Sequence, residues 1–119
     1  MVLFYLSGVP DETITFIGTL GDVYGMSLEN VRTEITRVDT EIIRLFAERQ
    51  ELASKIARIK KTRGLPIRDE QRASDVLDSV ASLAAEKGID PVAVRKIFEI
   101  LIHVSEEHQR ECSGKDDLH

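Results

Sequence analysis

The feature that most constrains this chain is the stretch 28–61, in which apolar side chains recur at the spacing of one helix face. At about 100° of rotation per residue these side chains fall on one side, as a core-facing helix requires. They are Leu28, Val31, Ile35, Val38, Ile42, Leu45, Phe46, Leu52, Ala53 and Ile56. Such a helix, about 34 residues and roughly 50 Å long, is too long for a small monomer to cover. Its length therefore predicts a partner chain.

Cations interrupt this apolar face. Arg49 and Lys60 lie near its middle, eleven residues or about three helical turns apart, and Arg32 lies at its edge. A charged group on a buried face is costly unless it is paired. We therefore expect an anionic group to bind against this face.

The composition is that of a helical protein with solvated outer faces: 42% of the 119 residues are hydrophobic, 31% are charged and 5% are aromatic. A net charge of −5 argues against nucleic acid or an anionic membrane as a partner, so a bound anion must be held by a local cluster of cations. The single cysteine, Cys112, favours a reducing compartment, and we predict a cytoplasmic protein. The three histidines lack ligand spacing, so we predict no metal and no cofactor.

Residues 1–25 differ in kind from the rest of the chain. Two segments rich in β-branched and aromatic residues flank turn residues at 7–11, which fits a weak β-hairpin or a disordered arm. The apolar run that opens this segment has no basic region of the kind found in a signal peptide, and the run is too short to span a bilayer. The alternative is that it covers a helical face or joins a dimer contact. We predict an N-terminal extension (1–25), a helical domain (26–112) and a polar tail (113–119).

Turn and capping residues divide the remainder into three helices. Ser27 caps the first helix, and Gly64 ends it. Asp69 caps the second, which runs to about residue 87. Asp90 and Pro91 begin the third, which runs to about residue 112. The predicted fold class is all-α, a three-helix chain with a long first helix.

Several polar residues lie on the inward faces of these helices. They are Arg32, Arg49, Lys60, Arg72, Ser105 and Gln109. No Ser/His/Asp or Cys/His arrangement and no carboxylate pair accompanies them, so such a pocket would grip a small polyanion without attacking it. Each cation alone is more often a rim residue with its stem on apolar surface. Other readings stay open: Arg49 and Lys60 pair with Glu48 or Glu51 across a coiled-coil seam, the two neutral groups satisfy each other, or the chain is a non-catalytic dimerisation module.

The order and spacing of these polar residues resemble those of the all-helical chorismate mutases, over residues 26 to about 111. The shared pattern consists of Arg32, Asp39, Arg49, Lys60, the segment 64–72 that reads G-x-P-x-R-D-x-x-R, and Phe98, Ser105 and Gln109. The resemblance implies an intertwined homodimer in which the long first helices pair. It also implies an isomerase that rearranges chorismate to prephenate in the shikimate pathway to the aromatic amino acids. That reaction needs no cofactor, nucleophile or proton transfer.

The resemblance also assigns roles to residues of this chain. Arg32 would be donated across the dimer interface to the partner's site, and Arg49 would grip a carboxylate of chorismate. Lys60 and Gln109 would donate hydrogen bonds to the ether oxygen of the breaking bond.

Three further substrate-binding residues follow from the same comparison. Asp69 would lie near the ring hydroxyl, largely through its backbone, and Arg72 would support the charge network. Ser105 would lie near a substrate carboxylate.

One position departs from the family pattern. Close relatives carry a glutamate after the second arginine of segment 64–72, and it bonds the ring hydroxyl, whereas this chain has Ala73. Glu70, Gln71, Ser74 or water are the candidate replacements. Isochorismate pyruvate-lyases resemble this fold and also lack that glutamate, so a lyase is the alternative function. Arg68 with Asp69 is closer to the mutases.

Overall fold

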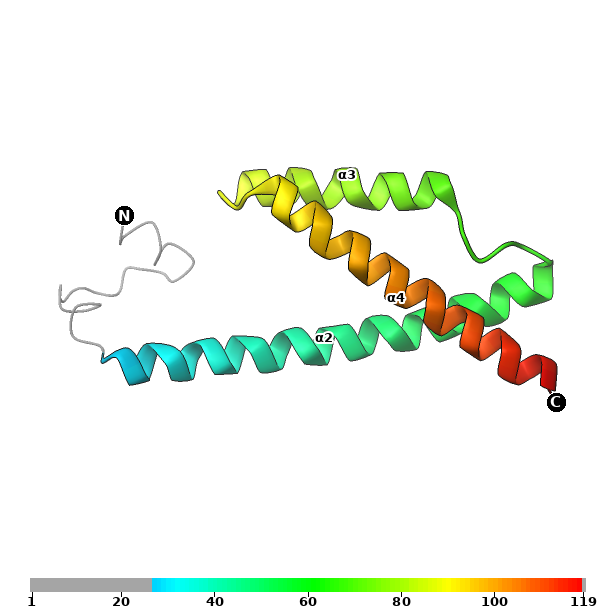
Figure 1. The fold of residues 1–119 in the computed structure, drawn as a ribbon, viewed down its shortest axis with the longest axis horizontal. Coiled ribbons are helices and arrows are strands. Elements are labelled where there is room, and N and C mark those ends of the chain that lie inside the picture. The colour runs from blue at the N-terminus through cyan, green and yellow to red at the C-terminus, as the bar shows by residue number, and fades with distance from the viewer. Residues whose placement is uncertain (1–26, 119) are drawn as a thin grey trace. The chain divides into compact units, whose positions relative to one another are not determined.

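The computed structural model describes residues 27–118, and three helices account for most of them (Figure 1). They are α2 (Leu28–Arg63), α3 (Glu70–Glu86) and α4 (Pro91–Leu118). No strand occurs in this described range, so the predicted all-α class with a long first helix is confirmed. The hairpin or disordered arm expected at residues 1–25 lies outside the described residues. None of the helices between residues 27 and 118 combines the length and apolarity needed to cross a membrane.

The helix ends are set by the capping residues that the sequence indicates. The Ser27 hydroxyl accepts a hydrogen bond of 3.0 Å from the backbone N–H three residues on, and the Asp69 carboxylate does the same for α3. Asp90 caps α4, again at 3.0 Å. Gly64 and Gly88 adopt φ values of 69° and 74°, which place them in the left-handed region that ends a helix. The predicted starts of all three helices are therefore confirmed, as are the ends of the first two.

The end of α4 differs from the prediction, because the helix continues to Leu118 instead of stopping near Cys112. Gly114 lies inside this helix with helical backbone geometry. A glycine in a helix costs only about 1 kcal/mol relative to alanine, so it weakens the helix without ending it. The polar composition of residues 113–118 predicts a helix stop. The segment itself contains neither a proline nor a residue with left-handed backbone geometry, so nothing in it ends the helix.

The chain divides into two compact units, Met1–Arg44 and Leu45–His119. The described part of the first unit is the N-terminal half of α2. Ion pairs at i,i+3 spacing line its polar side, and they join Arg32 with Glu29, Arg37 with Glu34, and Arg44 with Glu41. Five of its large apolar side chains are 44–64% exposed, and they are Leu28, Ile35, Val38, Ile42 and Ile43. The predicted apolar face is therefore present, and this half-helix by itself does not bury it.

The second unit contains the C-terminal half of α2 together with α3 and α4. Its buried apolar residues are all small: Ala53, Ala57, Ala73 and Ala84 are at most 6% exposed. Small side chains at helix contacts allow close approach. The inward placement predicted for Ala53 is confirmed. Larger members of the predicted stripe in this unit, such as Leu52 and Ile56, remain partly exposed.

Candidate active site

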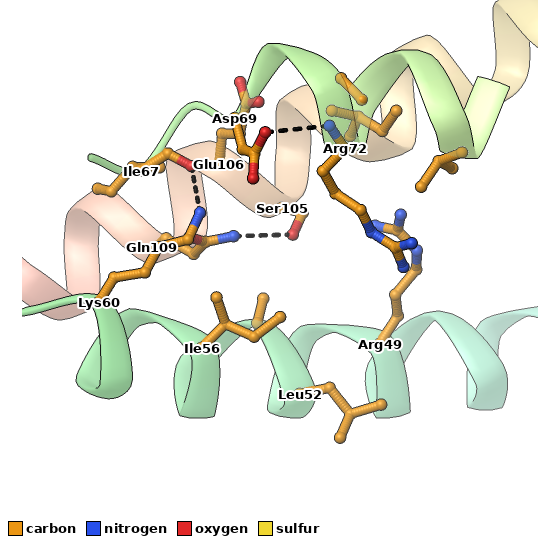
Figure 2. Close-up of a pocket in the computed structure, with 14 residues that line it drawn as sticks. Arg49, Leu52, Ile56, Lys60, Ile67, Asp69, Arg72, Ser105, Glu106 and Gln109 are labelled. Carbon is orange, nitrogen blue, oxygen red and sulfur yellow. Dashed lines mark hydrogen bonds between the residues drawn. The ribbon is translucent and has the colours of Figure 1, made fainter. Parts of the chain in front are cut away.

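The second unit contains a cavity of about 390 Å³ between the C-terminal half of α2, the connector to α3, and helices α3 and α4 (Figure 2). Its wall combines apolar and polar side chains. The polar lining residues are Arg49, Lys60, Asp69, Arg72, Ser105, Glu106 and Gln109. The structure thus brings six of the seven predicted site residues to one cavity, although they come from three helices.

The seventh predicted residue, Arg32, belongs to the first unit. Its side chain is exposed, and its guanidinium lies 3.6 Å from the carboxylate of Glu29. Its predicted role in a neighbouring site therefore stays a prediction.

Two arginines face each other at one end of the cavity. Figure 2 shows the guanidinium of Arg49, on α2, and that of Arg72, on α3, turned toward one another. The half-buried Arg49 donates from Nη1 to the carbonyl oxygen of Leu101 on α4 at 3.1 Å. Burial, and then the positive charge of Arg72, lower the pKa of Arg49. Within residues 27–118 neither guanidinium pairs with a carboxylate of its own chain, so this end of the cavity is prepared for an anion.

Lys60 and Gln109 lie together at the other end of the cavity (Figure 2). Lys60 donates from Nζ to the carbonyl oxygen of Ile67 in the connector, at 2.5 Å. Gln109 is 5% exposed and its Nε2 donates to Ser105 Oγ at a long 3.4 Å. Its Oε1 is buried and has no partner among the described residues.

An unpaired buried amide oxygen costs about 1–3 kcal/mol, so the Gln109 side chain is not satisfied by the protein alone. A half-turn of the amide exchanges its oxygen and nitrogen, so either atom can serve a ligand in the cavity. The expectation that Ser105 and Gln109 simply satisfy each other is therefore only half met: their bond exists, but it leaves one amide atom free.

Three nearby side chains were candidates to replace the family glutamate that is absent at Ala73. None of the three lines the cavity. Glu70 pairs with Arg68 at 3.0 Å, Gln71 donates to Asp75 at 2.9 Å, and Ser74 is exposed. Ala73 itself is buried and contributes only a methyl group.

Sequence reasoning missed one cavity residue, Glu106. It precedes Gln109 by three positions and therefore lies on the same face of α4, which is the signal that could have found it.

A second cluster corrects the expectation that no Ser/His or Cys/His arrangement exists. Ser54 Oγ lies 2.7 Å from His108 Nε2 and 3.4 Å from Cys112 Sγ, and the sulfur lies 3.8 Å from the same ring nitrogen. None of these side chains lines the cavity. No carboxylate within the described residues is bonded to His108, so the cluster lacks the third member of a hydrolytic triad. Its evident role is to tie α2 to α4.

These features define an all-helical chain whose cavity is lined by cations and hydrogen-bond donors and is equipped to bind a small anion. The model of the family described as chorismate mutase type II matches residues 31–110, which is more than half of the chain. The chain belongs to this family.

Individual relatives agree with the family match. The chain is 36% identical over 84 residues to the chorismate mutase of Methanocaldococcus jannaschii. That alignment covers 71% of this chain and 85% of the relative. It is 34% identical over 87 residues to the bifunctional chorismate mutase/prephenate dehydratase of Aquifex aeolicus, and 29% identical over 75 residues to that of Escherichia coli K12. These two alignments cover 71% and 63% of this chain, but only 22% and 19% of the larger relatives. The chain therefore corresponds to a small part of the bifunctional proteins.

Proposed function

We propose that the cavity binds chorismate and accelerates its rearrangement to prephenate, the step that leads toward phenylalanine and tyrosine. The observation that carries this proposal is the pair of facing guanidinium groups, Arg49 and Arg72, with no carboxylate between them. Two adjacent cations repel one another, and a substrate carboxylate between them would turn that repulsion into two attractions. Chorismate is a dicarboxylate and fits this requirement.

The rearrangement breaks a carbon–oxygen bond and forms a carbon–carbon bond within one molecule. It requires no nucleophile, so the cations and hydrogen-bond donors of the wall are sufficient for it. Arg49 and Arg72 would hold the flexible substrate in the compact conformer from which the bond forms. Negative charge grows on the ether oxygen in the transition state, and Lys60 and the buried Gln109 would be preorganised donors for it.

The remaining roles follow the family resemblance. Ser105 would contact a substrate carboxylate, and Asp69 would lie near the ring hydroxyl while its carboxylate caps α3. Arg32 would reach the cavity of a partner chain.

A homodimer is supported by the apolar face of α2, which the described residues leave largely uncovered. A contiguous exposed apolar surface of this kind marks an interaction site, and pairing of two α2 helices would cover both copies. The domain of residues 26–112 would be the working unit of each chain. The single free cysteine, Cys112, supports a cytoplasmic location.

The test is to mix purified protein with chorismate and follow its loss together with the appearance of prephenate. Lys60→Ala should lower kcat about 10²–10³-fold, the usual cost of removing one transition-state donor, while the helical circular dichroism is unchanged. Lys55→Ala is the matched control, because Lys55 is an exposed lysine of α2 outside the cavity wall. Absence of prephenate above the uncatalysed background would refute the proposal. Release of pyruvate from isochorismate would favour the lyase alternative.

A further inference from the structure

Glu106 is the feature of the cavity that the proposed reaction has not yet used. Its carboxylate is one of two in the wall, beside that of Asp69, and its side chain is only 12% exposed. A sheltered anion in a site for a dicarboxylate substrate would repel that substrate unless it meets a different part of the molecule. Its position therefore requires a specific ligand group.

The charge of Glu106 is balanced from outside the cavity. Arg68, in the connector, donates from Nη1 to Glu106 Oε2 at 2.7 Å. Its Nε and Nη2 bond the two oxygens of Glu70 at 3.0 and 3.2 Å, which fixes the guanidinium in place. Arg68 does not line the cavity. The ion pair thus holds the Glu106 carboxylate in position without using the arginines that face the ligand.

This arrangement leaves one acceptor available. Glu106 Oε1 takes part in no hydrogen bond within residues 27–118. An ionised carboxylate only accepts hydrogen bonds, so Oε1 can bind a hydroxyl or an N–H but not a second carboxylate. Chorismate has two carboxylates, an ether oxygen and one ring hydroxyl, and the hydroxyl is its one O–H donor when both acids are ionised.

We propose that Glu106 accepts a hydrogen bond from the ring hydroxyl of chorismate and thereby determines which way round the substrate binds, with Arg68 as its positioning residue. This inference rests on the proposed function. Ala73 offers only a methyl group at this wall, and Asp69 already uses Oδ1 to cap α3. Glu106 is also the more sheltered of the two carboxylates, and a hydrogen bond is stronger where water is excluded.

The experiment crosses two proteins with two substrates. Wild type and Glu106→Ala are each assayed for kcat/KM on chorismate and on its analogue that lacks the ring hydroxyl. Removing a charged acceptor should cost about 10–100-fold on chorismate. On the analogue the two proteins should differ by less than about twofold, because there the lost acceptor has no partner. Wild type should therefore discriminate strongly between the substrates, and the variant weakly.

Three further variants separate this role from a structural one. Glu107→Ala removes a neighbouring acidic residue of α4 that pairs with Arg110 outside the cavity and is 51% exposed, so it should leave both substrates unaffected. Arg68→Gln should reduce the discrimination part of the way. Glu106→Gln keeps the shape and a neutral acceptor, so it should show a smaller loss confined to chorismate even if Glu106→Ala does not fold.

Equal losses on both substrates would overturn the inference, as would a loss of discrimination in Glu107→Ala. The same holds if Asp69→Asn, and not the Glu106 variants, removes the discrimination. A wild-type protein inactive on chorismate would instead refute the proposed function. If wild type is active on chorismate but the Glu106 variants lose the same factor on both substrates, this inference alone is refuted.

Discussion

Replacement of Arg72 by methionine should stabilise the free protein and at the same time impair it as an enzyme. Methionine keeps an unbranched side chain but removes the charge that faces Arg49. The pKa of Arg49 is lowered by burial first and by Arg72 second, so the folded protein disfavours two charges at this point. An arginine side chain in a protein keeps its charge at ordinary pH. The destabilisation is therefore present throughout pH 6–9, and its relief should not depend on pH in that range.

The size of the effect follows from the exposure of the two groups. Two unit charges about 4 Å apart repel by about 1 kcal/mol in water, and more where water is excluded. Arg72 is exposed and Arg49 is half-buried, so screening keeps the repulsion near the lower value. The larger cause of the Arg49 shift, its burial, is not removed by the substitution. We expect a gain of about 0.5 kcal/mol, or about 2–4 °C in Tm for a domain of this size.

The assay combines thermal unfolding at low and high salt with turnover of chorismate. Tm should rise in low salt, and the gain should shrink as salt is added. The value of kcat/KM should fall about 10–100-fold, because a charged hydrogen bond to the substrate is lost. Arg95→Met is the matched control: Arg95 pairs with Asp78 at 2.7 Å outside the cavity, so its loss should not raise Tm or change turnover. A lower Tm for Arg72→Met, or undiminished turnover, would refute the reasoning.

Other substitutions test the donor, the shared site and the backbone. Gln109→Glu should be nearly inactive at neutral pH and regain activity on acidification, since a carboxyl donates only when protonated and an unperturbed glutamate has a pKa of about 4.3; full activity at pH 8 would contradict the donor role. Arg32→Ala and Arg49→Ala chains, each inactive alone, should regain about a quarter of wild-type activity when mixed equally, because half of the dimers would have one intact site of two. No rescue in verified heterodimers would exclude a shared site. Gly64→Ala should lower the free energy of unfolding by about 1 kcal/mol, because Gly64 has a φ of 69° although nothing lies within 4 Å of an added Cβ. Gly114→Ala has equal space at a helical position, so it should be neutral or stabilising. Equal effects of these two changes in chemical denaturation would show that strain is not the cause.

The fold was largely predictable because its signals are local. Ser27, Asp69 and Asp90 each bond a backbone N–H within three positions, and a cap of this kind acts without reference to the rest of the chain. The same is true of Gly64, whose backbone conformation ends α2. The late end of α4 was missed because a polar, glycine-containing segment weakens a helix without supplying a stop.

Much of the cavity was predictable because helical spacing places its residues. Arg49 and Lys60 share one face of α2, and Ser105 and Gln109 are one turn apart on α4. Glu106 was missed because an acidic residue beside a polar stripe reads as part of a solvated face, and only the position of Arg68 in the connector shows that its charge is held in place.

Contacts between distant parts of the chain could not be predicted. Ser54 and His108 are 54 positions apart, and their contact depends on the rotation and crossing of α2 and α4. Neither is fixed by a periodic pattern, because a helix can turn by tens of degrees about its axis and keep the same apolar stripe.

The alanine core of the second unit has a consequence for how this protein behaves in dilute solution. Within residues 27–118 the buried apolar side chains are single methyl groups, while the longer aliphatic side chains of α2 still contact solvent. A chain built in this way obtains little stabilisation from its own interior, and in the proposed homodimer a second chain would supply much of what it lacks. Its unfolding midpoint should then rise with total protein concentration, as mass action requires. The catalytic activity per chain would then fall on dilution. A change in the amount of protein made in a cell would therefore change the total activity by a larger factor than the amount itself.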